Sequence, residues 1–328
     1  MLRYLLRHGK RTAFGKDHDL AQVKDYKTFK KAVPVRDYEA LRGYVDRVIE
    51  GESNVLWRGK PMYLCKTSGT TSGNKYIPIT RASMPNHINA ARNALLSYIA
   101  SSKNSQFVNG KMIFLQGSPV LDTSGNIPIG RLSGIVANHV PSYLRKNRLP
   151  SYVTNCIEDW EAKVDAIVEE TYDKDMTLIS GIPAWVQMYF ERLLQKTGKA
   201  TIKEIFPNFS LFVYGGVNYE PYRAMFEATI GGVVDTVELF PASEGFFAFQ
   251  DTQDQEGLLL VLNAGIFYEF VRLEHINDDE PERISLSDVE LGVNYALILS
   301  TNAGLWGYSI GDTVKFVSKD PYRIIVTG

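Results

Sequence analysis

The sequence contains few residues that could form disulfide bonds or bind zinc. Its 328 residues include two cysteines, Cys65 and Cys156, which lie far apart and form no CxxC motif. The five histidines form no HxxH or HExxH pair, so a zinc site has no support. This cysteine content is typical of a protein from a reducing compartment such as the cytoplasm.

The sequence also lacks long apolar runs and blocks of one charge. No segment reaches the roughly 18 apolar residues that suggest a membrane-spanning helix, and the apolar run near the N-terminus is too short for a signal peptide. The net charge is −1, and Lys and Arg are mixed with Asp and Glu throughout. These patterns favour a soluble, cytoplasmic protein and argue against nucleic-acid or membrane partners. They do not indicate an oligomeric state.

Hydrophobic patterning predicts an α/β fold with a β-rich end. The chain is 45% hydrophobic, enough for a large core, and residues 1–50 have helical periodicity. Strands and helices then alternate, which favours mostly parallel sheets covered by helices. From about residue 244 short strands predominate, which indicates an antiparallel or barrel-like portion. We therefore expect an α/β body over about 1–243 and a β-rich subdomain over about 244–328.

The most informative stretch is KTSGTTSGNKYIPIT, at residues 66–80. Five of the six positions 67–72 carry hydroxyl side chains, and Gly69 and Gly73 permit backbone conformations that a Cβ would hinder. Such a loop can direct amides and hydroxyls toward an anion, and Lys75 would add positive charge. It is not a Walker A motif, because Lys75 does not directly follow the second glycine. From this stretch alone, a triphosphate site and an ordinary polar surface turn both remain open.

Two further stretches follow this loop, FPASEG at 240–245 and GLWGYSIGD at 304–312. With TSGTTSG at 67–73 they resemble the motifs of the adenylate-forming superfamily, which includes acyl-CoA synthetases, peptide-synthetase adenylation domains and luciferases. The resemblance is closer still to the auxin-responsive Gretchen Hagen family of acyl acid–amido synthetases. The segments NVLWRGKPMYLC, SGIPAW, LFVYGGVNYEPYR and GIFYEF are similar to bacterial members of that family. Three motifs in the same order are far more specific than one loop.

The resemblance implies an ATP- and Mg²⁺-dependent reaction in two steps. A small-molecule carboxylic acid is first activated as an acyl-adenylate, and an amine, often an amino acid, then displaces AMP to form an amide. Lys75 and Glu244 are implied as catalytic residues, Lys75 as a cation near the phosphates and Glu244 as the Mg²⁺ ligand. The implied nucleotide-binding residues are Thr67, Ser68, Gly69, Thr70, Thr71, Ser72 and Gly73 for the phosphates, Gly215, Gly216 and Val217 for adenine, Ser243 for nucleotide or substrate, and Asp312 for the ribose hydroxyls.

Several of these positions also have simpler interpretations. Lys75 could face solvent, Asp312 could be a turn residue at the start of a strand, and 214–217 could be a plain strand-to-helix turn. Glu244 is the strongest candidate, because a carboxylate among apolar residues needs a partner if it is buried. Trp185, Gly181 and 134–139 could line the acid pocket, but such residues more often belong to the core, and we expect none of them to be catalytic.

Two departures from the family pattern bear on function. Ser309 occupies the position of the arginine in the family's Tyr-Arg-Val-Gly-Asp motif, so a contact made through that arginine is not carried over. The chain ends at Gly328, about where the family's smaller C-terminal lid domain would follow, and a helix usual upstream is missing. We therefore expect an N-terminal core that forms little or no amide by itself. A ligase that passes the acyl group to a thiol and a non-catalytic nucleotide-binding protein remain alternatives.

Overall fold

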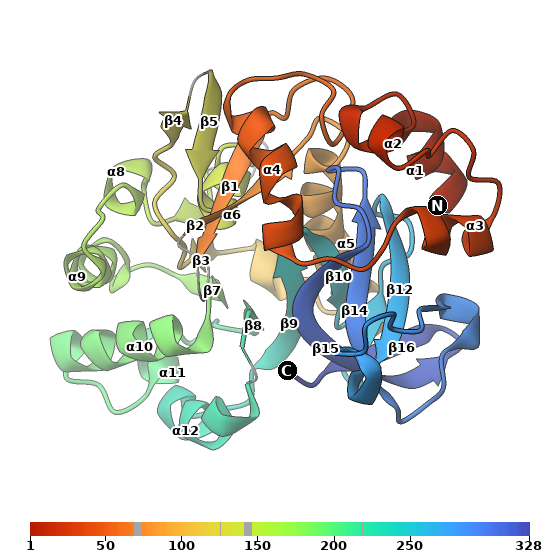
Figure 1. Ribbon diagram of the computed structural model, residues 1–328. Coiled ribbons are helices and arrows are strands. Elements are labelled where there is room, and N and C mark those ends of the chain that lie inside the picture. Colours follow the sequence, from red (N-terminus) through yellow and green to blue (C-terminus); the bar gives the residue numbers. More distant parts are fainter. Residues whose placement is uncertain (69–73, 125, 141–145, 218) are drawn as a thin grey trace.

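The computed structural model describes residues 1–68, 74–124, 126–140, 146–217 and 219–328 (Figure 1). Its α-helices are α1 (Leu2–Gly9), α2 (Ala13–Asp17), α3 (Tyr26–Ala32), α4 (Tyr38–Ile49), α5 (Met84–Ser102), α6 (Leu132–Ala137), α8 (Tyr152–Asn155), α9 (Trp160–Thr171), α10 (Pro183–Thr197), α11 (Ile202–Ile205) and α12 (Glu220–Ile230). Its strands are β1 (Tyr63–Ser68), β2 (Asn74–Ile79), β3 (Lys111–Phe114), β4 (Asp122–Ser124), β5 (Ile127–Gly130), β6 (Arg148–Leu149), β7 (Met176–Ser180), β8 (Leu211–Gly215), β9 (Asp235–Ala242), β10 (Gly245–Phe249), β11 (Leu258–Leu260), β12 (Ile266–Arg272), β13 (Ile284–Ser285), β14 (Asn294–Thr301), β15 (Tyr308–Lys319) and β16 (Tyr322–Val326).

A four-stranded sheet, ordered β2-β1-β5-β4, carries the hydroxyl-rich loop. β1 and β2 form an antiparallel hairpin around that loop, β5 pairs with β1 in parallel, and β4 pairs antiparallel with β5. The short strand β4 consists of Asp122–Ser124. The sequence of β4 is polar and has no apolar alternation, so only its pairing with β5 makes it a strand.

A second sheet of twelve strands runs through both the α/β part and the β-rich end of the chain. Its order is β13-β12-β14-β15-β16-β11-β10-β9-β8-β7-β3-β6. The strands from β6 to β9 pair in parallel, as expected where strands alternate with helices. From β9 to β13 every neighbouring pair is antiparallel. The predicted α/β fold class with a β-rich end is therefore confirmed.

Helices cover both faces of the parallel strands. On one face, Val186 and Phe190 of α10 belong to the same core as Ile179 and Phe212, and Figure 1 shows α9, α10 and α12 grouped on that side. On the other face, Ala94 of α5 packs in a core with Leu178 and Leu211. Successive side chains of β7 and β8 thus enter opposite cores, as the two-residue period of a strand requires.

The N-terminal helices pack against the end of the chain. The Trp306 indole donates a hydrogen bond of 3.0 Å to the carbonyl oxygen of Leu56. Arg283 donates to the carbonyl oxygens of Lys30, at 2.8 Å, and Val33, at 2.6 Å. Arg283 also forms a salt bridge of 3.3 Å with Glu269, and both side chains are buried. These contacts fix α3 and the segment that follows it onto β12 and β13.

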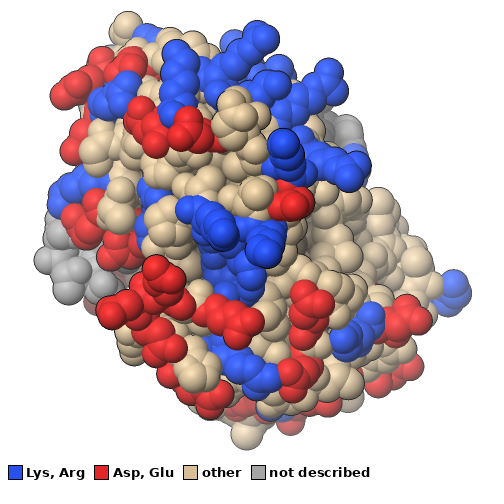
Figure 2. All heavy atoms as spheres, turned by 45° about the vertical axis from the view of Figure 1, so that its right-hand side comes forward, with Lys and Arg blue, Asp and Glu red and all other residues tan. Residues whose placement is uncertain are grey.

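The surface mixes charges of both signs. On the face in Figure 2, Lys and Arg are interspersed with Asp and Glu, although Lys and Arg gather in its upper right part. None of the helices within the described residues is long and apolar enough to cross a membrane.

A buried histidine on α5 should make the fold sensitive to acid. His87 is 5% exposed, and its Nδ1 has no hydrogen-bond partner among the described residues. Burial lowers the pKa of His87 to about 4, from 6.5. The unfolded chain takes up this proton at higher pH than the folded chain does, so stability should fall by about 3 kcal/mol as the pH drops from 6.5 to 4.

The His87→Leu variant should lose this part of the acid sensitivity. Urea unfolding gives the free energy of unfolding at pH 7 and at pH 4.5. The difference between these two values should be smaller for His87→Leu than for the wild type. The exposed Leu96 on the same helix provides the control, because Leu96→Ala removes no titratable group and should leave the difference unchanged. Equal acid destabilisation of His87→Leu and wild type would contradict the prediction.

Candidate functional site

The parallel strands β3, β7, β8 and β9 end along one edge of the large sheet. The segments that follow them are 115–117, Gly181-Ile182, Gly216-Val217 and Ser243-Glu244. Because ligands of open α/β sheets bind beyond the carboxyl ends of the strands, this edge is the natural place for a site. The sequence predicted nucleotide contacts at two of these four segments.

The phosphate-loop candidates lie where the β1–β2 hairpin closes. Gly69, Thr70, Thr71, Ser72 and Gly73 lie outside the described residues. On either side of them, Thr67 pairs with Lys75, and Ser68 pairs with Asn74. The half-buried Lys75 places its ammonium nitrogen 5.9 Å from the centre of the Tyr38 ring. The Tyr38 hydroxyl in turn accepts a hydrogen bond of 2.9 Å from the backbone N–H of Tyr76.

Ser243 and Glu244 form the tight connection between β9 and β10. The fully buried Cys65 thiol of β1 donates to the Ser243 hydroxyl at 3.1 Å, so this connection is held against the hairpin. Burial raises the pKa of the Cys65 thiol to about 11, which keeps it neutral. Cys65 therefore acts here as a small packing residue with a weak donor.

Glu244 is the electrostatic centre of the site. Burial raises the pKa of its carboxyl to about 7, the negative charge of Asp312 adds to the increase, and the positive charge of Lys75 opposes it. Tyr308 also influences this carboxyl and opposes the increase in its pKa. Charged residues of β2 and β15 therefore influence the carboxyl of Glu244 in the β9–β10 connection.

Asp312 lies inside strand β15 rather than at the start of a strand. The sequence predicted a strand start there, and this is wrong because β15 begins at Tyr308. The pairing of β15 with β14 shifts around this position, and Gly311 has a φ of +95°, in the left-handed region that favours glycine. Asp312 thus sits in a bulge, half-buried, and burial raises the pKa of its carboxyl.

The two glycines at the end of β8, Gly215 and Gly216, are needed by the backbone itself. A Cβ on Gly215 would come within 2.4 Å of the Leu239 carbonyl oxygen, and Gly216 has a φ of +84°. Val217 is 42% exposed at the same turn. The turn therefore brings exposed backbone to the carboxyl edge, where a flat ring could lie against it.

The two carboxylates of the site suit a divalent cation. Burial is the main cause of the raised pKa of Glu244, and the negative charge of Asp312 adds to it; hard carboxylate oxygens are preferred Mg²⁺ ligands. Among the described residues no group of three or more His, Cys, Asp and Glu forms a dedicated metal cage. Such a site fits Mg²⁺, which usually binds through one or two carboxylates together with substrate phosphates.

The residues considered for the acid pocket have structural contacts. Trp185 stacks at an angle against Trp160, with ring centroids 4.3 Å apart, and a Cβ on Gly181 would approach Leu115 at 2.9 Å. His139 Nε2 lies 3.0 Å from the Tyr63 hydroxyl, and burial lowers the pKa of His139. None of these contacts makes one of them a catalytic group.

Sequence reasoning missed three residues that shape this site: Tyr38, Cys65 and Tyr308. Tyr308 lies within the GLWGYSIGD motif, so its position was visible in the sequence although its role was not. Tyr38 has only the spacing of a core residue on a helix. Cys65 has no signal beyond its place before the loop.

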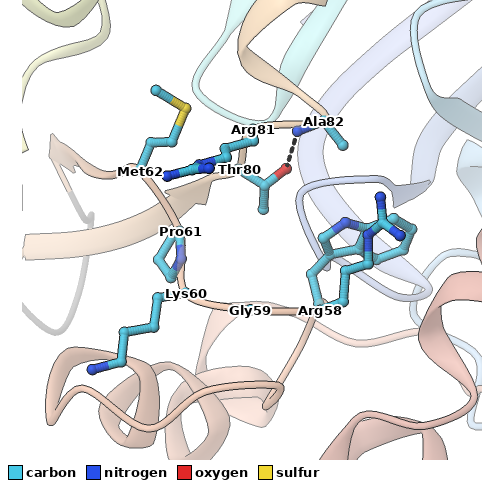
Figure 3. Close-up of a pocket in the computed structure, with 9 residues that line it drawn as sticks. Arg58, Gly59, Lys60, Pro61, Met62, Thr80, Arg81 and Ala82 are labelled. Carbon is cyan, nitrogen blue, oxygen red and sulfur yellow. Dashed lines mark hydrogen bonds between the residues drawn. The ribbon is translucent and has the colours of Figure 1, made fainter.

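A separate pocket opens at the other end of the β1–β2 hairpin (Figure 3). Its volume is about 490 Å³, and its lining residues are Trp57, Arg58, Gly59, Lys60, Pro61, Met62, Thr80, Arg81 and Ala82. The Thr80 hydroxyl accepts the Ala82 N–H at 3.2 Å and donates to the Asn302 carbonyl at 2.8 Å. Since each strand of the hairpin spans roughly 20 Å, this pocket lies away from the phosphate loop, and we place the candidate site at the loop end.

Two family models match the chain. The GH3 family N-terminal domain matches residues 1–154, and the GH3 family central domain matches residues 259–326. Together they cover more than half of the 328 residues.

Curated relatives of the chain include two plant synthetases. A jasmonoyl–L-amino acid synthetase, JAR4 of Nicotiana attenuata, is 22% identical over 357 residues, which cover 89% of this chain and 61% of the relative. The indole-3-acetic acid-amido synthetase GH3.4 of Arabidopsis thaliana is 24% identical over 388 residues, which cover 96% of this chain and 63% of the relative. The chain therefore spans about three fifths of the length of these relatives.

Solved structures share the fold over nearly the whole chain. AtGH3.15 acyl acid amido synthetase, in complex with 2,4-DB, has a TM-score of 0.80 at 18% identity and covers 99% of this chain and 66% of its own. A 2-hydroxyisobutyryl-CoA ligase, in complex with 2-HIB-AMP and CoA, has a TM-score of 0.62 at 14% identity. The match covers 96% of this chain and 62% of the ligase chain. These similarities establish the fold of adenylate-forming ligases. The family models, the relatives and the fold agree with the resemblance seen in the motifs, and the chain belongs to the GH3 family.

Proposed function

We propose that this chain is the nucleotide- and acid-binding part of an ATP-dependent ligase. The ligase activates a carboxylic acid as an acyl-adenylate and transfers the acyl group to an amine or amino acid, as its relatives are named for doing. The observation that carries the proposal is the position of Ser243 and Glu244 at the carboxyl edge, held against the β1–β2 hairpin that carries Lys75, where the charges of Lys75 and Asp312 act on the pKa of Glu244. We also propose the division into a body over 1–243 and a β-rich subdomain over 244–328, and a cytoplasmic location.

In the first step a carboxylate oxygen of the acid attacks the α-phosphorus of ATP. The bond from that phosphorus to the oxygen bridging to the β-phosphate breaks, and pyrophosphate leaves with the electron pair. Both reactants are anionic, so positive charge and oriented donors must offset the charge that develops. Lys75 and the donors of residues 67–73 are proposed to hold the β- and γ-phosphates, which become the pyrophosphate.

Glu244 is the proposed Mg²⁺ ligand, and bound Mg²⁺ would supply charge neutralisation on the phosphate oxygens. Tyr308 of β15 is proposed to help position the Glu244 carboxylate, whose pKa it influences. Asp312 is proposed to accept hydrogen bonds from the two ribose hydroxyls, and Gly215 to Val217 to lie against adenine. Ser243, held by Cys65, is proposed to contact the nucleotide or the acid.

In the second step the nitrogen of the acceptor attacks the acyl carbon. The bond from that carbon to the phosphate oxygen breaks, AMP leaves, and the nitrogen loses a proton. Transfer to a thiol follows the same course, and the shared fold with a 2-hydroxyisobutyryl-CoA ligase supports that alternative acceptor class. Product analysis with amino acids and with coenzyme A as competing acceptors distinguishes amide from thioester.

Binding of AMP should stabilise the chain through Asp312. A ligand at about 100 times its dissociation constant raises stability by roughly 2.7 kcal/mol, which a thermal melt detects. Addition of AMP, or of ATP with Mg²⁺, should raise the melting temperature of the wild type but not of Asp312→Ala, because the ribose hydroxyls then lose their acceptor. The exposed Asp279→Ala variant serves as the control and should keep the full shift.

The opposite result would remove the central support for this function. A wild type whose melting temperature does not respond to either nucleotide, or an Asp312→Ala variant that responds fully, contradicts the assignment of the ribose to Asp312.

A further inference from the structure

Three buried hydrogen-bond donors lie near the carboxyl end of β3 with almost no acceptors. Lys163 of α9 is 2% exposed, and its ammonium makes one long contact, 3.5 Å, to the Gln116 carbonyl oxygen. The side-chain nitrogens of Gln116 and of Trp160, one helical turn before Lys163, are buried and have no acceptor among the described residues.

A buried ammonium without a carboxylate is unusual because desolvation costs several kcal/mol unless a partner offsets it. Burial lowers the pKa of Lys163, and the nearby charge of Arg131 adds to this decrease while Cys156 opposes it. Among the described residues, the charged groups that act on Lys163 are Arg131 and Cys156, and no carboxylate is among them. One buried ammonium and two unused neutral donors thus lie near the end of β3 without an anion to bind.

These donors lie on the same edge of the sheet as the candidate site. The Leu115 N–H donates to the Ser180 carbonyl at 2.8 Å, so Gln116 lies beside Gly181, where β7 ends. Trp185 of α10 packs on Trp160 and so lies next to these donors. Glu244 follows β9, three strands from β3 in the sheet order, or roughly 14 Å along the edge at the usual strand spacing.

We propose that Lys163, with Gln116 and Trp160, recognises a second carboxylate on the acid that the ligase activates. The substrate class is therefore a dicarboxylic acid, with one carboxylate at the nucleotide and the other at the buried ammonium. This inference rests on the proposed function. A carboxylate there would complete the hydrogen bonds of all three donors and offset the desolvation of Lys163.

Binding of matched acids tests the proposal. The probes are the dicarboxylates succinate, adipate and suberate, each compared with its monocarboxylate of equal chain length, butyrate, hexanoate or octanoate. Titration calorimetry in the presence of AMP should show at least one dicarboxylate binding ten times more tightly than its partner. In Lys163→Met this preference should disappear, with the monocarboxylate affinity changed less than twofold. Lys163→Arg should keep a preference, and the exposed Lys199→Met should keep it in full.

A purely structural role for Lys163 predicts a different result. If Lys163 only held Gln116 in place, Lys163→Met would lower the melting temperature without acid. Our proposal expects an unchanged or higher melting temperature, because an unpaired charge is removed. If Lys163→Met does not fold, Gln116→Leu serves as the second variant and should weaken dicarboxylate binding alone.

Two failures are distinguishable. Absence of AMP binding to the wild type overturns the proposed function. If AMP binds, equal binding of dicarboxylates and monocarboxylates, absence of binding by every dicarboxylate, or an intact preference in Lys163→Met overturns the inference.

Discussion

Replacing Glu244 with Gln is expected to stabilise the ligand-free protein at pH 8 by about 2–3 kcal/mol. The pKa of this carboxyl is raised from 4.5 to about 7 in the folded protein. As the pH rises, the unfolded carboxyl therefore ionises first, and folding loses stability between pH 4.5 and 7. The amide in Glu244→Gln carries no charge, keeps an oxygen that can accept from Tyr308, and removes this loss.

The same substitution is expected to abolish function. If Glu244 holds Mg²⁺, Glu244→Gln should slow ATP–pyrophosphate exchange of the complete ligase at least 100-fold, a change of about 2.7 kcal/mol in the barrier. Urea unfolding at pH 5 and pH 8 and the exchange assay measure both effects. The exposed Glu256→Gln should change neither. A variant that is less stable than the wild type at pH 8, or fully active, would refute the role given to Glu244.

Replacing Arg283 with Met is expected to destabilise the fold by about 3–5 kcal/mol. This change leaves the buried Glu269 carboxylate without its charge partner, which is the costly way to disrupt a buried ion pair. It also removes the donors to the carbonyl oxygens of Lys30 and Val33. Urea unfolding of the variant at pH 7 measures the loss.

Two companion variants make that experiment specific. The double variant Arg283→Met with Glu269→Met should recover part of the loss, because no charge is then buried alone. Arg272→Met removes an arginine from an exposed pair with Glu290 and should cost less than about 1 kcal/mol. If Arg272→Met and Arg283→Met lower the free energy of unfolding by similar amounts, burial of the ion pair does not determine how much it contributes to stability.

The sequence led to a site prediction where the chemistry follows from a motif. Glu244 lies after a strand and before an apolar run, and only a functional or paired carboxylate is tolerated there. In the structure the charges of Lys75 and Asp312 act on the pKa of Glu244, although these residues are far apart in the sequence. The strand-helix alternation similarly predicted the parallel part of the large sheet.

The rest of the site depends on contacts that no local pattern encodes. Tyr38 has the spacing of a core residue on α4, yet its hydroxyl meets β2. The position of Asp312 inside β15 depends on a bulge whose only sequence trace is Gly311. Lys163 looks like an ordinary helix lysine, because sequence spacing does not reveal that packing against β3 buries it.

The contacts between the N-terminal helices and the end of the chain also constrain the order of folding. Lys30 and Arg283 are 253 residues apart, and Leu56 and Trp306 are 250 apart. At a synthesis rate of about 5–20 residues per second, the first helices leave the ribosome roughly 10–50 s before their partners do. During that interval the apolar faces of the first helices lack the surface against which they pack in the folded protein. We therefore expect chaperones to protect these helices early, and the contacts with the end of the chain to form in a slow, late folding step.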